Sequence, residues 1–127
     1  MIDRIDHFVL TVRSITETCA FYKRALGFEV VRFGEGRVAL GFGPHKINLH
    51  EVGREFEPKA RVPTSGSADF CLTTAEPVEA LATRLTGLGI AIEEGTVTRT
   101  GARAALRSIY LRDPDGNLVE IANEVPA

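Results

Sequence analysis

The sequence has only two cysteines, no excess of basic residues and no long apolar run. Cys19 and Cys71 stand far apart and outside any CxxC pattern, which indicates reduced thiols that serve as small core residues. Fifteen basic against seventeen acidic residues give a net charge of −2, and the scattered basic residues disfavour a nucleic-acid partner. The apolar runs are too short to cross a membrane, and MIDRIDHF carries acids where a secretory peptide carries basic residues. We therefore expect a cytoplasmic protein without a membrane or nucleic-acid partner.

The chain does contain an internal repeat. An offset of 62 residues aligns HFVL at 7–10 with DFCL at 69–72, and LGF at 26–28 with LGI at 88–90. For the last strand of each copy we predict an offset of 70, which aligns His50 with Glu120, and we attribute the change to a longer connection over 95–104. The 127 residues are thus interpreted as two copies of one unit in a single domain.

Each copy is predicted to be a βαβββ module of an α+β fold. In the first helix, Ser14 and Glu17 fit a capping box and Gly27 suits a C-cap, while Pro77 is expected in the first turn of the second helix. The modules span about 4–53 and 68–124 and are joined by a linker over 54–67. The predicted strands are 5–12, 29–33, 37–43 and 46–52 in the first module, and 68–74, 91–99, 105–112 and 118–123 in the second.

Strand alternation predicts a cluster of polar side chains on the faces away from the helices. The apolar residues of the first strand pack beneath its helix, so His7 points to the opposite face, and the same reasoning applies to His50, Asp69 and Glu120. A buried imidazole or carboxylate without a partner costs free energy, whereas together these groups can satisfy one another through a cation. Such donors suit Zn(II), Fe(II), Mn(II), Co(II) or Ni(II) and leave positions open for a substrate.

Each position also has a purely structural interpretation. His50 beside Glu51 can form a surface ion pair, Glu120 can be an exposed strand residue, and Asp69 can end a turn.

Three further residues are candidates for contact with a substrate. Ser108 and Tyr110 share a strand face and either line the same site or simply fill the interior. Arg103, one of three arginines around Gly101, is available for an anionic substrate or is solvated.

The IDHFVLTV opening, the FYKRALGF helix end and the YLRDPDGNLVEI close resemble the vicinal oxygen chelate superfamily over the full chain. This superfamily includes glyoxalase I, bleomycin-resistance proteins, fosfomycin-modifying enzymes and extradiol dioxygenases. The stretch HKINLHEVGREFEPKARVPTSGSADFCLTT is most similar to the glyoxalase domain-containing protein 5 group. The resemblance implies a curved, partly closed mixed sheet with helices outside. It also implies one divalent metal ion held by His7, His50 and Glu120, with Asp69 as a weak fourth ligand or base.

The resemblance further implies an isomerase or lyase that acts on a small molecule with vicinal oxygens, with Glu120 or Asp69 moving a proton. One alternative is an extradiol-type dioxygenase, since two His and one carboxylate also make an iron oxygenase site. Another is a non-catalytic drug-binding protein of the bleomycin-resistance type. Many relatives pair, so a homodimer is expected.

Overall fold

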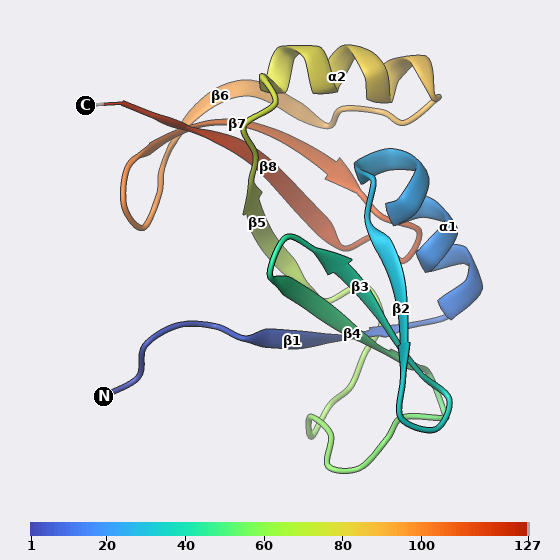
Figure 1. The fold of residues 1–127 in the computed structure, drawn as a ribbon. Helices are drawn as coiled ribbons and strands as arrows, with labels where there is room; N and C mark the ends of the chain where they lie inside the picture. The colour runs from blue at the N-terminus through green and yellow to red at the C-terminus, as the bar shows by residue number, and fades with distance from the viewer. Residues whose placement is uncertain (127) are drawn as a thin grey trace. The chain divides into compact units, whose positions relative to one another are not determined.

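The computed structural model describes residues 1–126, and the chain divides into two compact units. The first unit comprises Met1–Ser67 and Pro114–Gly116, and the second comprises Ala68–Asp113 and the segment from Asn117 onward. Each unit holds one βαβββ module with a four-stranded mixed sheet (Figure 1). The predicted paired modules are therefore confirmed, with two separate sheets in place of one continuous sheet.

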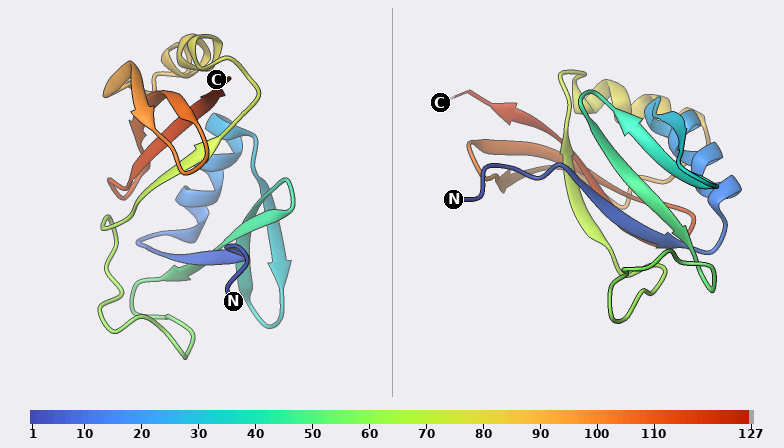
Figure 2. Two further views of the ribbon diagram at one scale, coloured as in Figure 1. Left: turned by 90° about the vertical axis from the view of Figure 1, so that its left-hand side faces the viewer. Right: turned by 60° about the horizontal axis from the view of Figure 1, so that its bottom comes forward.

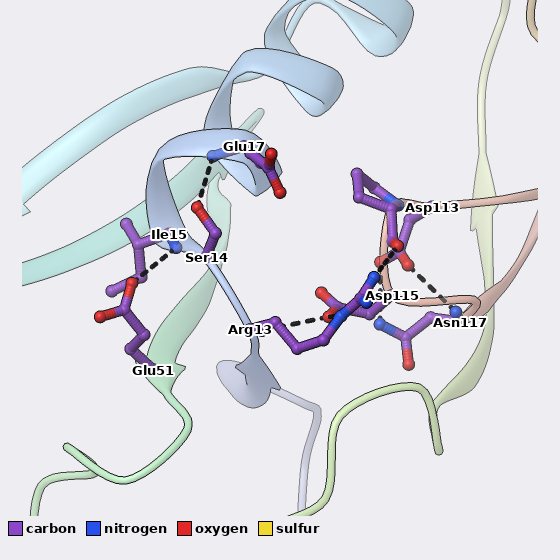
Figure 3. Close-up of polar contacts among 9 residues, drawn as sticks. Arg13, Ser14, Ile15, Glu17, Glu51, Asp113, Asp115 and Asn117 are labelled. Atoms are coloured by element: carbon purple, nitrogen blue, oxygen red, sulfur yellow. Dashed lines mark hydrogen bonds and ion pairs between the residues drawn. The ribbon is translucent and has the colours of Figure 1, made fainter.

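The first sheet has the strand order β1-β4-β3-β2, in which β1 is parallel to β4 and the other pairs are antiparallel. Its helix α1 begins as predicted, because the Ser14 hydroxyl accepts a hydrogen bond from the Glu17 backbone at 3.1 Å (Figure 3). The Glu51 carboxylate adds a second cap on the Ile15 backbone N–H, and Gly27 ends the helix in the left-handed conformation. The elements are β1 His7–Val12, α1 Ile15–Leu26, β2 Glu29–Phe33, β3 Arg37–Phe42 and β4 His45–Glu51.

The second sheet repeats this order as β5-β8-β7-β6, with β5 parallel to β8. Pro77 is the N-cap of α2 and not part of its first turn, and the Asn123 side chain accepts a hydrogen bond from the Val78 backbone at 2.9 Å. Strand β6 begins three residues later than predicted and β8 extends two residues further. The elements are β5 Asp69–Thr73, α2 Val78–Gly87, β6 Glu94–Thr100, β7 Ala105–Arg112 and β8 Leu118–Val125.

In each unit the helix covers one face of its own sheet, which Figure 2 shows from two further sides. Tyr22 and Ala25 of α1 are fully buried, as are Ile47 and Leu49 of β4. The second unit is built the same way, with Leu85 among the fully buried residues of α2. Burial of these side chains is the main source of stability for each module. The opposite face of each sheet carries the polar positions.

The last strands of the two modules match at an offset of 72, so the predicted offset of 70 was wrong. In the parallel pairs, Val9 lies opposite Asn48 and Cys71 lies opposite Glu120. Since Val9 and Cys71 correspond at the offset of 62, the counterpart of Glu120 is Asn48 and not His50. The extra residues are spread over several connections, mainly 88–93 and 113–117, because most of the segment 95–104 belongs to the strand β6.

The turn before β8 is held by side-chain hydrogen bonds (Figure 3). Asn117 donates from its backbone and its amide to the Asp113 carboxylate, at 3.0 and 2.8 Å, and accepts from the Ala68 backbone at 2.9 Å. Within the first unit, the backbone and the guanidinium of Arg13 both donate to Asp115 Oδ1, at 3.1 and 2.8 Å. These contacts satisfy polar groups that the irregular backbone leaves without sheet partners.

Two further expectations can be compared with the structure. Cys19 is buried as predicted, whereas Cys71 is exposed and is not a core residue. Neither helix in residues 1–126 is long and apolar enough to cross a membrane.

Candidate functional site

His7 opens β1 on the face away from α1, as strand alternation predicted. Its side chain is 42% exposed, and Nδ1 donates to the Asp6 carboxylate at 2.7 Å. This hydrogen bond, together with the charge of the imidazole, lowers the pKa of Asp6. A carboxylate on one ring nitrogen is the usual partner of a metal-binding histidine, because it orients the ring and leaves Nε2 for the ion.

Asn48 was missed by the sequence analysis. It lies on β4 at the position equivalent to Glu120, is only 6% exposed, and its Oδ1 has no hydrogen-bond partner within residues 1–126. A buried acceptor without a partner costs about 1–3 kcal/mol, so such an atom indicates a missing ligand. The signal in the sequence is the shared pattern of one polar residue between two branched apolar ones, INL at 47–49 and VEI at 119–121.

His50 lies two residues beyond Asn48 and four positions along the β1–β4 pair from His7, since His50 is opposite Thr11. At a strand rise of about 3.3 Å per residue, His7 and His50 are separated by about 13 Å along the sheet. A first-row ion stands only about 2 Å from each imidazole nitrogen. The prediction that these two histidines of one module share an ion is therefore corrected.

The environment of His50 also excludes the surface ion pair with Glu51. His50 is 3% exposed and meets the edge of the Phe56 ring at a centroid distance of 5.7 Å. Burial, followed by the charge of Arg37, lowers the pKa of this imidazole below 6.5. His50 is therefore a buried, neutral imidazole.

Glu120 lies on β8 with one oxygen held in place. The hydroxyl of the fully buried Ser108 donates to Glu120 Oε2 at 2.7 Å, while Tyr110 is its direct neighbour across the β7–β8 pair. The predicted common face of Ser108 and Tyr110 thus carries Glu120 as well. A carboxylate with one oxygen already hydrogen-bonded is oriented to use the other oxygen as a metal ligand or proton acceptor.

Two titratable groups flank Glu120. The Tyr110 hydroxyl accepts a hydrogen bond from Arg99 Nε at 2.9 Å, and burial raises the pKa of Tyr110, so the phenol keeps its proton. Loss of solvent around its thiol, and then the Glu120 carboxylate, raise the pKa of Cys71 to about 11. Although the residue is exposed, its thiol is therefore protonated at neutral pH and is not an activated nucleophile.

The other residues predicted for the site are Arg103 and Asp69. Arg103 is 81% exposed and pairs with Glu124 through two hydrogen bonds. Arg107, another of the three arginines around Gly101, pairs with Glu79 of α2 and so points to the helix face. Asp69 is the exposed first residue of β5 and matches His7 in the repeat.

The donors can be assessed one module at a time. Neither unit, within residues 1–126, gathers three His, Cys, Asp or Glu side chains that are able to hold an ion by themselves. One module supplies His7 and the unpaired Asn48 oxygen, and the other supplies Asp69 and Glu120 with its Ser108 partner.

Comparisons with known proteins identify the family. The Glyoxalase/Bleomycin resistance protein/Dioxygenase superfamily matches residues 4–121. The chain is 54% identical over 125 residues to the virulence protein STM3117 of Salmonella typhimurium, covering 98% of this chain and 87% of that protein. The crystal structure of that protein superposes with a TM-score of 0.97 over 98% of this chain and 99% of the other.

Two further relatives extend the comparison. The glyoxalase domain-containing protein RDO1 of Mycosarcoma maydis is 49% identical over 119 residues, covering 94% of this chain and 67% of that protein. The fosfomycin resistance protein FosX of Listeria monocytogenes, solved with Mn(II) and sulfate, is 20% identical with a TM-score of 0.68 over 98% of this chain and 93% of the other, and shares the fold. The chain therefore belongs to the Glyoxalase/Bleomycin resistance protein/Dioxygenase superfamily.

Proposed function

We propose that the protein is a divalent-metal-dependent lyase or isomerase that acts on a small molecule with vicinal oxygens. The observation that carries this proposal is the register of the two β ladders. It gives Asn48 and Glu120 equivalent positions, as the repeat does for His7 and Asp69. All four polar side chains belong to the strand faces opposite the helices, where an apolar residue would be expected if the faces only packed.

The proposed ligands are His7 and Glu120, with the Asn48 oxygen and Asp69 completing the set. One imidazole with three oxygen donors is a harder ligand set than the two imidazoles that we first expected, and it favours Mn(II) over Zn(II). Superfamily members such as FosX bind Mn(II). When bound, such an ion supplies Lewis acidity that stabilises negative charge on two vicinal oxygens.

Three residues near the proposed ion have separate proposed roles. Ser108 holds Oε2 of Glu120, and the other oxygen is the proposed donor to the ion. Asp69, exposed at the start of β5, is the proposed base and accepts a proton from carbon or oxygen of the substrate when it is off the ion. Tyr110 keeps its proton and can donate a hydrogen bond to a developing oxyanion.

The extradiol-type dioxygenase is the weaker alternative. Iron oxygenase sites use two His and one carboxylate on one face of the ion, and removal of His50 from the set leaves His7 alone. A non-catalytic drug-binding protein would explain neither the two carboxylates, Asp69 and Glu120, on one sheet face nor the Asn48 oxygen that has no hydrogen-bond partner within residues 1–126. We also propose that the protein forms a homodimer.

The test is metal analysis of the purified protein after reconstitution with Mn(II), beside His7→Ala, Glu120→Gln and His50→Gln. We expect about one ion per chain in wild type and in His50→Gln, and loss of the ion in the other two variants. If His50→Gln also loses the ion, the set predicted from the sequence, His7, His50 and Glu120, would be supported instead. A wild type that binds no ion would favour the drug-binding alternative.

The same variants test whether two chains share a site. If His7 and Glu120 of different chains hold one ion, a mixture of His7→Ala and Glu120→Gln chains regains part of the metal content that each variant lacks. Sedimentation of the mixture shows whether the recovery accompanies a dimer.

A further inference from the structure

A pocket of about 390 Å³ lies within the first unit. Its floor is formed by β1 and β4, on the sheet face opposite α1, and its wall by the segment that follows β4. That segment is the loop at the bottom of Figure 1. A volume of this size is in the range of small-molecule sites. The lining residues are Val9, Thr11, His50, Pro58, Lys59, Ala60 and Pro63.

His50 is the buried polar group of this pocket. The residue is 3% exposed and lines the pocket. Phe56 fixes the ring through an edge contact, and the Arg37 guanidinium lies over Phe56 at 4.4 Å from its centroid. A buried imidazole that lines a cavity can hydrogen-bond a ligand there.

The polar groups of the pocket can all donate a hydrogen bond. Thr11 supplies a hydroxyl, His50 a ring N–H and Lys59 an ammonium group, and none of the seven lining residues is an Asp or Glu. Lys59 Nζ stands 3.5 and 3.6 Å from the carboxylates of Glu55 and Glu57, and as an ammonium group with three N–H donors it can also bind a further acceptor. The remaining wall is apolar.

We propose that this pocket binds a small organic carboxylate with a compact apolar body. The carboxylate accepts hydrogen bonds from Thr11, His50 and Lys59, and the apolar body contacts Val9 and the two prolines. The lining includes no proposed metal ligand, although Val9 lies opposite Asn48, and the test below uses metal-free protein so that it does not depend on the proposed function.

Benzoate is a suitable probe, and benzamide is its neutral counterpart of the same shape. Titration calorimetry on the full chain, stripped of metal with a chelator, should show saturable benzoate binding. We expect binding of benzamide to be weaker by about 10-fold or more, because a charged acceptor on three donors is stronger than a neutral one. Equal affinity for both compounds, or no saturable benzoate binding, would overturn the proposal.

Variants assign the site. Lys59→Met should weaken benzoate by about 10-fold or more and Thr11→Val by about 3-fold, whereas Lys46→Met, on the same unit but outside the pocket, is the matched control. His50→Phe keeps a ring against Phe56 and removes both nitrogens. In wild type, benzoate should shift the NMR signals of Thr11 and Ala60, which tests the location without any substitution. Equal effects of the two lysine variants, or shifts confined to other residues, would contradict it.

Discussion

The hydroxyl of Ser108 donates to Glu120 Oε2 over 2.7 Å, from a residue with no exposed surface. Ser108 is on β7 and Glu120 on β8, two positions apart along the antiparallel pair, since Ser108 lies opposite Ala122 and Tyr110 opposite Glu120. The carboxylate is therefore oriented by the sheet itself and not by a mobile loop. Rigid support of this kind is typical of a ligand or base that must hold one geometry.

Ser108→Ala should weaken Mn(II) binding by about 10-fold or more, because loss of an outer hydrogen bond to a metal ligand has effects of that size. Titration calorimetry with Mn(II) measures the change. Thr98→Ala, on the neighbouring strand β6 and away from the carboxylate, is the control. Unchanged affinity in Ser108→Ala would show that the hydrogen bond is only structural.

Asn48→Leu should have opposite effects on stability and on metal binding. In the metal-free protein it removes a buried acceptor that has no partner, so the free energy of unfolding should stay the same or rise by about 1 kcal/mol. In the same variant Mn(II) affinity should fall. Urea unfolding measures the stability, and titration calorimetry measures the Mn(II) affinity. A clear loss of stability would mean that the Asn48 amide serves packing.

Asn117→Ala should lower the free energy of unfolding by about 2–4 kcal/mol. The substitution removes two hydrogen bonds that involve the side chain and leaves the buried Asp113 carboxylate and the Ala68 N–H without these partners. Urea unfolding measures the loss, and Asn48→Leu is the matched control at another buried asparagine. A change below about 0.5 kcal/mol would contradict this role of the turn.

Cys71 should react slowly with iodoacetamide although the residue is exposed. Its pKa of about 11 leaves little thiolate at pH 8, and the Glu120 carboxylate contributes to that rise. Glu120→Gln should therefore lower the thiol pKa and speed the reaction. Mass spectrometry of the Cys71 peptide over a pH series gives the reaction rates in wild type and in Glu120→Gln. An unchanged rate in the variant would show that Glu120 does not raise the thiol pKa.

His50 should make the metal-free protein less stable in mild acid. Its pKa is below 6.5 in the folded state, so below 6.5 the unfolded chain binds more protons there. The stabilising contribution is present above pH 6.5 and is lost as the pH falls through the folded pKa. Urea unfolding of wild type and His50→Phe over this window should show a steeper decline in wild type. If stability declines equally with pH in both proteins, burial does not lower the pKa of His50 in the folded state.

The amino-acid sequence by itself determined the elements and the face of each strand. The alternation in β1 and β5 placed His7 and Asp69 opposite the helices, and the Ser14 cap and Gly27 marked both ends of α1. These features depend on neighbours a few residues away, for which local periodicity is sufficient. The same holds for Glu120, which lies between two core residues of β8.

Only the tertiary structure decided which positions of different strands lie side by side. Asn48 replaced His50 as the counterpart of Glu120 because the register of a parallel pair depends on hydrogen bonds between distant segments, and connections of unequal length hide it in the sequence. The burial of His50 beneath Phe56 and the pairing of Ser108 with Glu120 likewise arise from packing between segments. Periodicity specifies the face of a residue, whereas its neighbours on that face are chosen by the fold.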